Sequence, residues 1–576
     1  MQRPGSGSRR PGTTATVAGR TFDAVVVGSG ASGGWAAKRL SEAGLQVCLL
    51  EAGRALTDAD YKEHVPAYAL PYRNRADELM RRTRPKQKDC YACREWNYDW
   101  FANDIDEPYT TPRDKPFAWM GRLRVVGGRT NVWGRQSYRL GDIDFKAASH
   151  DGHGVDWPIS YADLSPYYDI VEDYVGINGL TEGPDAIVPD GRFHPAMGMS
   201  CVEHFVRNRL RTQFGRTMTQ GRSANITRPI NGRAACHYCG PCEHGCATHS
   251  YFNAAFTTVA DAVKTGRTTL VTGAMVAQVV TDPSTNRARG VRYIDRHTRD
   301  VREVYGKVVV LAAQALESTR ILLNSRDGGL GNASGVLGKY LMDHISGGGA
   351  VAEFADLAST PNGPNSPRRP NGIYLMRFRN LPGRPDTKAT NFLRGYGYQG
   401  GGSTGYKSWA PGFGEAYKKA LRSDTATTFS LGGFGECLPR EDNQVTLDRD
   451  VVDAWGIPVL RVSMRWSDNE LHMRQDMAVQ AAEMLDALGG RNIEVRTANH
   501  QVPGYGIHEV GTARMGADPK TSVLNGFQQT HDVKNLFVTD GAGFPSIACQ
   551  NPTLTIMALT VRSCDYMLEQ MKKGDL

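Results

Sequence analysis

The stretch TFDAVVVGSGASGGWAAKRLSEAGLQVCLLEAG, residues 21–53, decides the fold of this chain. Its pattern predicts a strand over residues 24–27, a glycine-rich turn, an alanine-rich helix that ends near Ala43, and a second strand over residues 47–50. A turn with GxGxxG spacing between a strand and a helix is typical of a dinucleotide site. The free N–H groups and the positive dipole end at the start of the helix attract the pyrophosphate.

The glycines and the acid of this unit have separate tasks. Gly28 permits the tight turn, Gly30 lets the backbone approach a pyrophosphate, and Gly33 permits close packing of the helix on the strand. Glu51, which ends the second strand, is placed to accept a hydrogen bond from a ribose hydroxyl, and a 2′-phosphate would oppose this. Because strand, helix and acid all agree with the motif, a dinucleotide site is favoured over a chance match.

The length and charge of the chain limit its class. A chain of 576 residues can hold roughly two to four domains, and no apolar run approaches the ~18 residues of a membrane span. The net charge of +8 is mild, so we expect no nucleic-acid partner. Residues 1–20 contain Arg9 and Arg10, but Pro11 and polar residues follow, which indicates a disordered tail and no signal peptide. We therefore expect a cytoplasmic protein, or a periplasmic one that is exported together with a partner subunit.

Both ends of the chain have α/β character and the middle is rich in β-structure. Residues 268–280 and 301–312 read as strands, and residues 535–546 form a strand that ends at Asp540 and glycines before a helix opened by Asn551. Residues 347–465 read as an antiparallel sheet, and Ser467 with Glu470 forms a capping box for a following helix. We predict a Rossmann-type α/β domain, discontinuous over 21–60, 118–145, 250–346 and 505–576. An α+β substrate domain on a large antiparallel sheet is inserted into it over 61–117, 146–249 and 347–504.

Two polar residues near the C-terminus suggest alcohol oxidation. His508 stands in the loop GIHEVGTARMG, and Asn551 opens the last helix. An alcohol carbon gives up a hydride only if the hydroxyl proton leaves to a base, and a neutral imidazole accepts it while an amide nitrogen holds the oxygen. The alternatives are a surface or capping histidine and an asparagine that caps the helix. Other histidines, such as His344 and His531, are assigned structural roles.

The cysteines point to a metal or redox centre. Four of the eleven, Cys236, Cys239, Cys242 and Cys246, fall within one short loop with the spacing C-x2-C-x2-C-x3-C. This spacing matches loops that wrap iron–sulfur clusters. Structural zinc, which usually takes two ligand pairs farther apart, and unligated thiols remain alternatives. The pair Cys90 and Cys93 is left unassigned: it is redox-active, binds metal with a partner, or only lines a loop.

Five segments together resemble the motifs of the glucose-methanol-choline (GMC) oxidoreductases. They are GSGASGG with LLEAG, GGRTNVWG, VVVLAAQALESTRILLNS, HEVGTARMG, and VTDGAGFPSIACQNPTLTIMALT. The resemblance implies FAD, and oxidation of an alcohol by hydride transfer to flavin N5, with His508 and Asn551 at the active site. It implies flavin contacts from the turn at Asp540 and Gly541 and cofactor contacts from the segment with Gly127, Gly128 and Asn131. Val132 stands where pyranose oxidases carry a flavin-linking histidine, so noncovalent FAD is implied.

The cysteine loop is similar to that of flavoprotein subunits of bacterial glucose, fructose and glucoside 3-dehydrogenases. In that branch three cysteines, spaced like Cys236, Cys242 and Cys246, hold a [3Fe-4S] cluster. Cys239 departs from the pattern and as a fourth ligand would make the cluster [4Fe-4S]. The resemblance implies oxidation of a sugar or glycoside hydroxyl to a ketone or lactone, with electrons passed to a small partner subunit or a cytochrome.

Two further hypotheses stand beside this one. The first is an oxygen-using sugar or alcohol oxidase of the same fold, similar to pyranose oxidase, without a functional cluster. The second is a scaffold or electron-transfer module that has lost catalysis, which the presence of His508 and Asn551 opposes.

Overall fold

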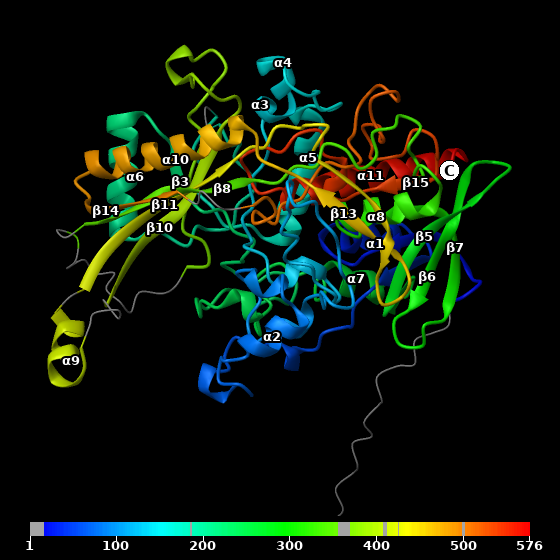
Figure 1. Cartoon of the computed structure of the whole chain (residues 1–576), viewed down its shortest axis with the longest axis horizontal. Helices are drawn as coiled ribbons and strands as arrows, with labels where there is room; N and C mark the ends of the chain where they lie inside the picture. Colours follow the sequence, from blue (N-terminus) through cyan, green and yellow to red (C-terminus); the bar gives the residue numbers. More distant parts are fainter. Residues whose placement is uncertain are drawn as a thin grey trace, which may run out of the picture.

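The computed structural model describes residues 17–184, 187–354, 357, 369–406, 412–423, 425–497 and 502–576. Two large sheets lie at the two ends of the molecule (Figure 1). The sheet with β5, β6 and β7 occupies one end of the molecule, and the sheet with β8, β10 and β11 occupies the other. Irregular segments fill the region between them.

The first sheet has seven strands, in the order β4-β2-β1-β7-β6-β5, with β15 paired to β7. The bounds are β1 (Thr21–Val27), β2 (Val47–Glu51), β4 (Thr268–Thr272), β5 (Ala274–Asp282), β6 (Arg287–Asp295), β7 (Val301–Leu311) and β15 (Leu536–Val538). Strands β4, β2, β1, β7 and β15 pair in parallel, and β5 and β6 are antiparallel. The predicted single strand over 268–280 is wrong: at Gly273 (φ 69) the chain turns, and β4 and β5 join opposite edges of the sheet.

Helices cover this sheet. They are α1 (Ala31–Glu42), α5 (Tyr161–Val175), α7 (Thr258–Lys264), α8 (Ala315–Ser325) and α11 (Thr553–Lys573). Helix α1 packs against α7 and α11, and α5 packs on α11. The strand residues Ala24 to Val27 are all buried, as expected for a parallel strand between two covered faces. The predicted Rossmann-type arrangement is therefore confirmed in β1, the glycine turn, α1 and β2.

The second sheet has six strands in the order β14-β8-β11-β10-β9-β3, all antiparallel. The bounds are β3 (Met218–Gln220), β8 (Ile345–Glu353), β9 (Ile373–Leu375), β10 (Tyr396–Tyr406), β11 (Thr425–Gly435) and β14 (Arg491–Thr497). Helices α6 (Cys201–Phe214) and α10 (Asp468–Ala487) pack on it (Figure 1). Glycines in β11 admit α10: a Cβ atom at Gly433 would lie 2.5 Å from the sulfur of Met477. The predicted antiparallel sheet is confirmed for β8 to β11, but β3 and β14 join it from outside residues 347–465, and residues 444–463 form a separate hairpin. The capping box of Ser467 and Glu470 is confirmed.

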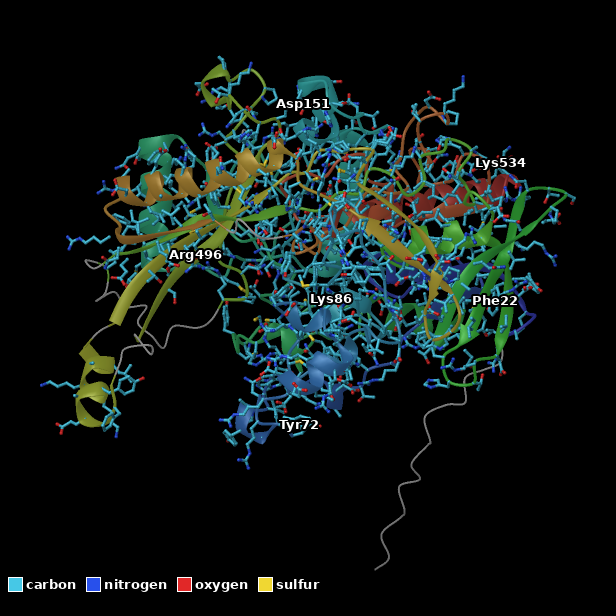
Figure 2. The ribbon with its side chains drawn as sticks, in the orientation of Figure 1. Phe22, Tyr72, Lys86, Asp151, Arg496 and Lys534 are labelled. Carbon is cyan, nitrogen blue, oxygen red and sulfur yellow. The ribbon has the colours of Figure 1, made fainter. Side chains whose placement is uncertain are left out.

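The remaining elements are smaller. They are α2 (Asp77–Thr83), α3 (Asp142–Phe145), α4 (Ala147–Asp151), α9 (Gly414–Ser423) and the hairpin of β12 (Gln444–Val452) and β13 (Pro458–Ser463). The segment around α2 projects from the lower side of the molecule, where Figure 2 labels Tyr72. None of the helices in the described ranges combines the length and the apolar character needed to cross a bilayer.

Most of the predicted N-terminal tail, residues 1–16, lies outside the described residues. Its last four residues are not a free tail. Val17 is buried, and the Gly19 N–H donates a 2.8 Å hydrogen bond to the Glu303 carbonyl. This contact fastens the start of the described chain to the first sheet, next to β1.

Candidate active site

A cavity of about 270 Å³ lies against the carboxyl ends of β1, β2 and β7. It is lined by residues from both ends of the chain. The predicted cofactor residues among them are Gly28, Gly30, Glu51, Gly128, Asp540 and Gly541, and both predicted catalytic residues, His508 and Asn551, line it too. Clefts at the carboxyl ends of parallel strands are the usual ligand sites of such sheets.

The glycine turn is shaped for close backbone packing. Gly28 has a φ of 95°, and a Cβ atom there would lie 2.4 Å from the Ala312 carbonyl oxygen. A Cβ atom at Gly33 would lie 1.8 Å from the Gly28 oxygen, so only glycine lets α1 begin here. By contrast, a Cβ atom at Gly30 would have no atom nearer than 3.9 Å. The backbone at Gly30 is therefore open, and no side chain caps α1, whose first N–H groups are left for a ligand.

Glu51 connects the glycine turn, through Ser29, to the segment that begins at Gly127. Its carboxylate accepts hydrogen bonds from the Ser29 N–H (3.2 Å), the Ser29 hydroxyl (2.5 Å) and the Gly53 N–H (2.8 Å). The Ser29 oxygen in turn accepts a 3.0 Å bond from the Gly127 N–H. A carboxylate has about four acceptor positions, so Glu51 keeps capacity for a ribose hydroxyl. The residues present therefore fit a dinucleotide.

Three predicted cofactor residues do not line the cavity in the described chain: Gly33, Gly127 and Asn131. The buried Asn131 amide donates to the carbonyls of Val126 (3.0 Å) and Gly128 (2.8 Å). Its oxygen accepts a 2.6 Å bond from Asn253. The Asn131 side chain thus stabilises the turn at residues 126–128 and does not line the cavity.

Asp540 and Gly541 do reach the cavity, at the end of β15. The Asp540 carboxylate accepts bonds from the Ser318 hydroxyl (2.5 Å) and the Ala542 N–H (3.0 Å). Burial raises the pKa of Asp540 to about 6. Both bonds anchor the turn that presents Gly541 to the cavity.

His508 is held in one tautomer by a second histidine. Nε2 of His344 lies 2.5 Å from the Ala548 carbonyl oxygen, which only accepts, so this nitrogen carries hydrogen. Burial lowers the pKa of His344 to about 4, so its other nitrogen, Nδ1, is a bare acceptor at neutral pH. That nitrogen lies 2.7 Å from Nδ1 of His508, which must therefore donate. The hydrogen-bond network thus assigns an unprotonated Nε2 to His508.

The free nitrogen of His508 faces Asn551. Nδ2 of Asn551 lies 3.3 Å from Nε2 of His508. Burial lowers the pKa of His508 well below its ordinary value, and the positive charge of the Arg129 guanidinium lowers it further. His508 is therefore neutral at physiological pH, which a general base requires.

Asn551 does not cap the last helix, so that alternative is wrong. Helix α11 begins at Thr553 with Pro552 as its N-cap, and no side chain caps it. The Asn551 oxygen instead accepts a 2.7 Å bond from Gln399 of β10. Since the amide oxygen is taken by Gln399, the amide nitrogen is turned toward His508.

Asp343 fixes the loop that carries His508. Its carboxylate accepts hydrogen bonds from the backbone N–H groups of Gly504, Gly506 and His508, at 3.0, 3.0 and 2.9 Å. Burial and the Glu509 carboxylate raise the pKa of Asp343 to about 7. Neither Asp343 nor His344 was selected from the sequence. The only signal in the sequence was that two polar residues, Asp343 and His344, stand directly before β8.

The cysteine loop adjoins the cavity. Arg135 lines the cavity. Its guanidinium lies 5.6 Å from the centroid of the Tyr251 ring, which packs in one buried cluster with Cys242 and Cys246. Cys242 and Cys246 are buried, whereas Cys236 and Cys239 are partly exposed. Burial and the three neighbouring thiols raise the pKa of Cys239 to about 11. The cysteine loop therefore lies next to Arg135, a residue of the cavity wall.

The arrangement of these thiols bears on the metal that they suit. Among the described residues, the one group of three or more possible ligand atoms within 4.8 Å of one another is His64, His237 and Cys239. The four cysteine sulfurs do not form such a group, although a single tetrahedral zinc ion would need one. The four thiols by themselves therefore do not fit a single zinc ion.

Cys90 and Cys93 are buried free thiols. Burial raises the pKa of Cys93 to about 12, so its thiol is protonated at neutral pH and is a weak nucleophile. Cys90 also lines the cavity.

Two family models match the chain. Both are described as GMC oxidoreductase, and they cover residues 22–346 and 439–560. The chain belongs to the GMC oxidoreductase family. It is similar to 2-methyl-1,2-propanediol dehydrogenase of Mycolicibacterium austroafricanum, with 31% identity over 95% of each chain. It is 29% identical to the fructose dehydrogenase large subunit of Gluconobacter japonicus, over 96% of this chain and 98% of that one.

A solved structure shows the same fold. The formate oxidase of Aspergillus oryzae RIB40 superposes with a TM-score of 0.59 at 14% identity, over 96% of this chain and 99% of that chain. The predicted family, fold class and enzyme class are therefore confirmed. This GMC oxidoreductase is an FAD enzyme that acts on the CH–OH groups of alcohols or sugars.

Proposed function

We propose that this enzyme oxidises a hydroxyl of a sugar or glycoside to a ketone or lactone and sends the electrons through an iron–sulfur cluster to an external acceptor. The observation that carries the chemistry is the unprotonated Nε2 of His508 at the cavity, held by His344 and facing Asn551. The observation that carries the electron route is the cysteine loop beside the same cavity.

In the proposed reaction His508 acts as the general base. The substrate hydroxyl gives its proton to Nε2 of His508, while Nδ2 of Asn551 donates a hydrogen bond to the same oxygen. The carbonyl forms as the carbon loses a hydride. When bound, FAD supplies at N5 the acceptor for this hydride. The amide donor is most useful in the transition state, because negative charge grows on the oxygen there.

The residues that would hold FAD follow from the cavity. The open backbone at Gly30 and the N-terminus of α1 suit the pyrophosphate, and Glu51 suits the ribose. The turn of Asp540 and Gly541 suits the flavin. Because Val132 precedes Trp133, we propose noncovalent binding.

The cysteine loop supports the electron-transfer half of the proposal. A cluster held by Cys236, Cys242 and Cys246, with or without Cys239, would relay electrons one at a time. The burial of Cys242 and Cys246 suits a cluster shielded from solvent. The likeness to a protein named as a large subunit supports a small partner subunit or a cytochrome as acceptor.

Absorption and metal content test the proposal. The purified protein should contain iron, and its spectrum should show a broad iron–sulfur shoulder beside the flavin bands. Anaerobic addition of sugars, glycosides and simple alcohols should identify the substrate by bleaching of the flavin bands. An iron-free protein that turns over at full rate with oxygen as the only acceptor would contradict the cluster and establish the oxidase alternative.

A further inference from the structure

A short segment after the first β-α-β unit lies directly against the cysteine loop. The Lys62 N–H donates a 3.1 Å hydrogen bond to the His244 carbonyl, and the Glu63 carboxylate accepts a bond from the Ala247 N–H. The Tyr61 ring fills the space beside Gly245, where a Cβ atom would lie 2.5 Å from ring carbon Cδ1. Residues 61–65, here called the anchor segment, are thus fixed against the loop at three points.

His64 of the anchor segment meets two residues of the loop. Its ring lies 5.4 Å, centroid to centroid, from the ring of His237. One ligand atom each from His64, His237 and Cys239 lies within 4.8 Å of the other two. The loop backbone turns at Tyr238 (φ 59) and Gly240 (φ 104), on either side of Cys239. Two imidazoles and a thiol from separate segments therefore converge at the surface.

This ligand set has the chemistry of a zinc site. Zinc binds histidine nitrogen and cysteine sulfur at about 2.0 to 2.3 Å, which puts tetrahedral ligand atoms about 3.3 to 3.8 Å apart. Movements of roughly an ångström by exposed side chains would complete the site. His64 and His237 are exposed and Cys239 is partly exposed, so an ion can enter and water can take the fourth position.

A buried carboxylate stands behind the site. The Glu63 side chain is 1% exposed, and an oxygen of it lies 3.7 Å from Nε2 of His64. Among the described residues, His64 is its ion-pair partner, and no lysine or arginine lies within ion-pair distance of it. A carboxylate beside a metal-bound imidazole orients the ring. The negative charges of Glu63 and a Cys239 thiolate together would balance a divalent cation.

We propose that His64, His237 and Cys239 bind one zinc ion, separate from the cysteine cluster, which fastens the anchor segment to the cysteine loop. The site assigns Cys239, the cysteine that departs from the family spacing, to zinc. If the cluster of the proposed function exists, its protein ligands are then Cys236, Cys242 and Cys246 alone. The zinc site itself does not depend on that cluster.

The test measures zinc and iron in the same samples. The full-length holoenzyme is incubated with Zn²⁺, freed of excess metal, and assayed by mass spectrometry for zinc and iron per FAD. The wild type should retain about one zinc, and His64→Asn, His237→Asn and Cys239→Ser should each weaken retention against a competing chelator by about 10- to 100-fold or more. His297→Asn, which changes an exposed histidine in a distant turn, is the matched control and should bind zinc like the wild type.

Iron distinguishes this proposal from the assignment of Cys239 to the cluster. Iron content and the electron paramagnetic resonance spectrum of the cluster should be unchanged in all four variants. Zinc retention that survives the histidine substitutions would overturn the zinc site, as would loss of iron in Cys239→Ser. A protein that lacks iron would contradict the cluster of the proposed function, while the zinc measurements would still decide the zinc site. X-ray absorption at the zinc edge should show two nitrogen ligands and one sulfur ligand.

Discussion

The surroundings of His508 and the cysteine loop are both assembled from distant segments, but they are completed in different ways. Around His508 the polar groups are satisfied by other groups of the protein. His344 donates to the Ala548 carbonyl, and the Asp343 carboxylate accepts from three backbone N–H groups. In the loop, thiols and imidazoles face one another at Cys239 and His237. The first region is therefore preorganised by the polypeptide, and the second offers the ligand types of the metal sites that we propose. Removal of one side chain should have local effects in the first region and lose a whole cofactor in the second.

The largest effect should follow from loss of the proposed base. His508→Ala removes the proton acceptor, so the rate of substrate-dependent flavin bleaching should fall by about 10²- to 10⁴-fold. FAD should remain bound, because no predicted pyrophosphate or ribose contact involves His508. Stopped-flow bleaching and flavin content measure the two quantities. A rate within tenfold of wild type would remove His508 from the mechanism.

Cys246→Ser should distinguish the contribution of the cysteine loop from that of the His508 site most clearly. The variant should lose iron and turnover with an external dye, because a buried ligand of the proposed cluster is gone. Anaerobic bleaching by substrate should persist at the wild-type rate, since the His508 network is untouched. Cys564→Ser, a change of a buried thiol in α11, serves as the control and should keep its iron. Loss of bleaching together with iron would show that the two regions are not independent.

Asn551→Ala should cost less than loss of the base. A hydrogen bond to a charged group contributes about 1.5 to 3 kcal/mol, so the bleaching rate should fall about 10- to 100-fold. Loss of the Asn551 oxygen also frees Gln399, so Gln399→Ala is the matched variant and should have a smaller effect. Rapid kinetics of both variants with one substrate check this order, and the reverse order would contradict the role given to the Asn551 amide.

His344→Ala should reduce the rate by about tenfold, because His508 would then exchange between its two tautomers. His344 is a positioning residue, so the informative readout is the pH profile. Burial is the main cause of the low pKa of His508, and the His344 ring packs directly on it. Removal of that ring should therefore move the acid limb of kcat/KM to higher pH. A uniform loss of rate with an unmoved acid limb would indicate that His344 only packs.

The sequence predicts the parts of the cavity that depend on a local pattern or on a family motif. The glycine turn and Glu51 follow from the spacing of one β-α-β unit, and His508 and Asn551 follow from the family resemblance. His344 could not be selected, because its contact with His508 joins positions 164 residues apart. His64 was missed for the same reason. Asn131 was assigned to the cofactor through the family resemblance, whereas its side-chain amide donates to the carbonyls of Val126 and Gly128 in the same turn.

The smallest effect concerns stability and pH. The pKa of Asp343 is raised from 3.8 to about 7 in the folded protein by burial and by the Glu509 carboxylate. The native state therefore holds a proton that the unfolded chain has released. Asp343 contributes stability in full below pH 3.8, and this contribution is lost as the pH rises through about 7.

The free energy of unfolding should therefore decrease from pH 6 to pH 8, by about 1 kcal/mol for this group. Asp343→Asn has no charge to titrate, so the decrease should be smaller in that variant even though its loop bonds are weaker at every pH. Urea unfolding at several pH values measures the slope, which is independent of a constant loss of stability. An unchanged slope would mean that Asp343 is ionised throughout this range, and the raised pKa would be wrong. A reduced slope would show that the carboxyl group that fixes the His508 loop takes up a proton in the native protein as the pH falls through about 7.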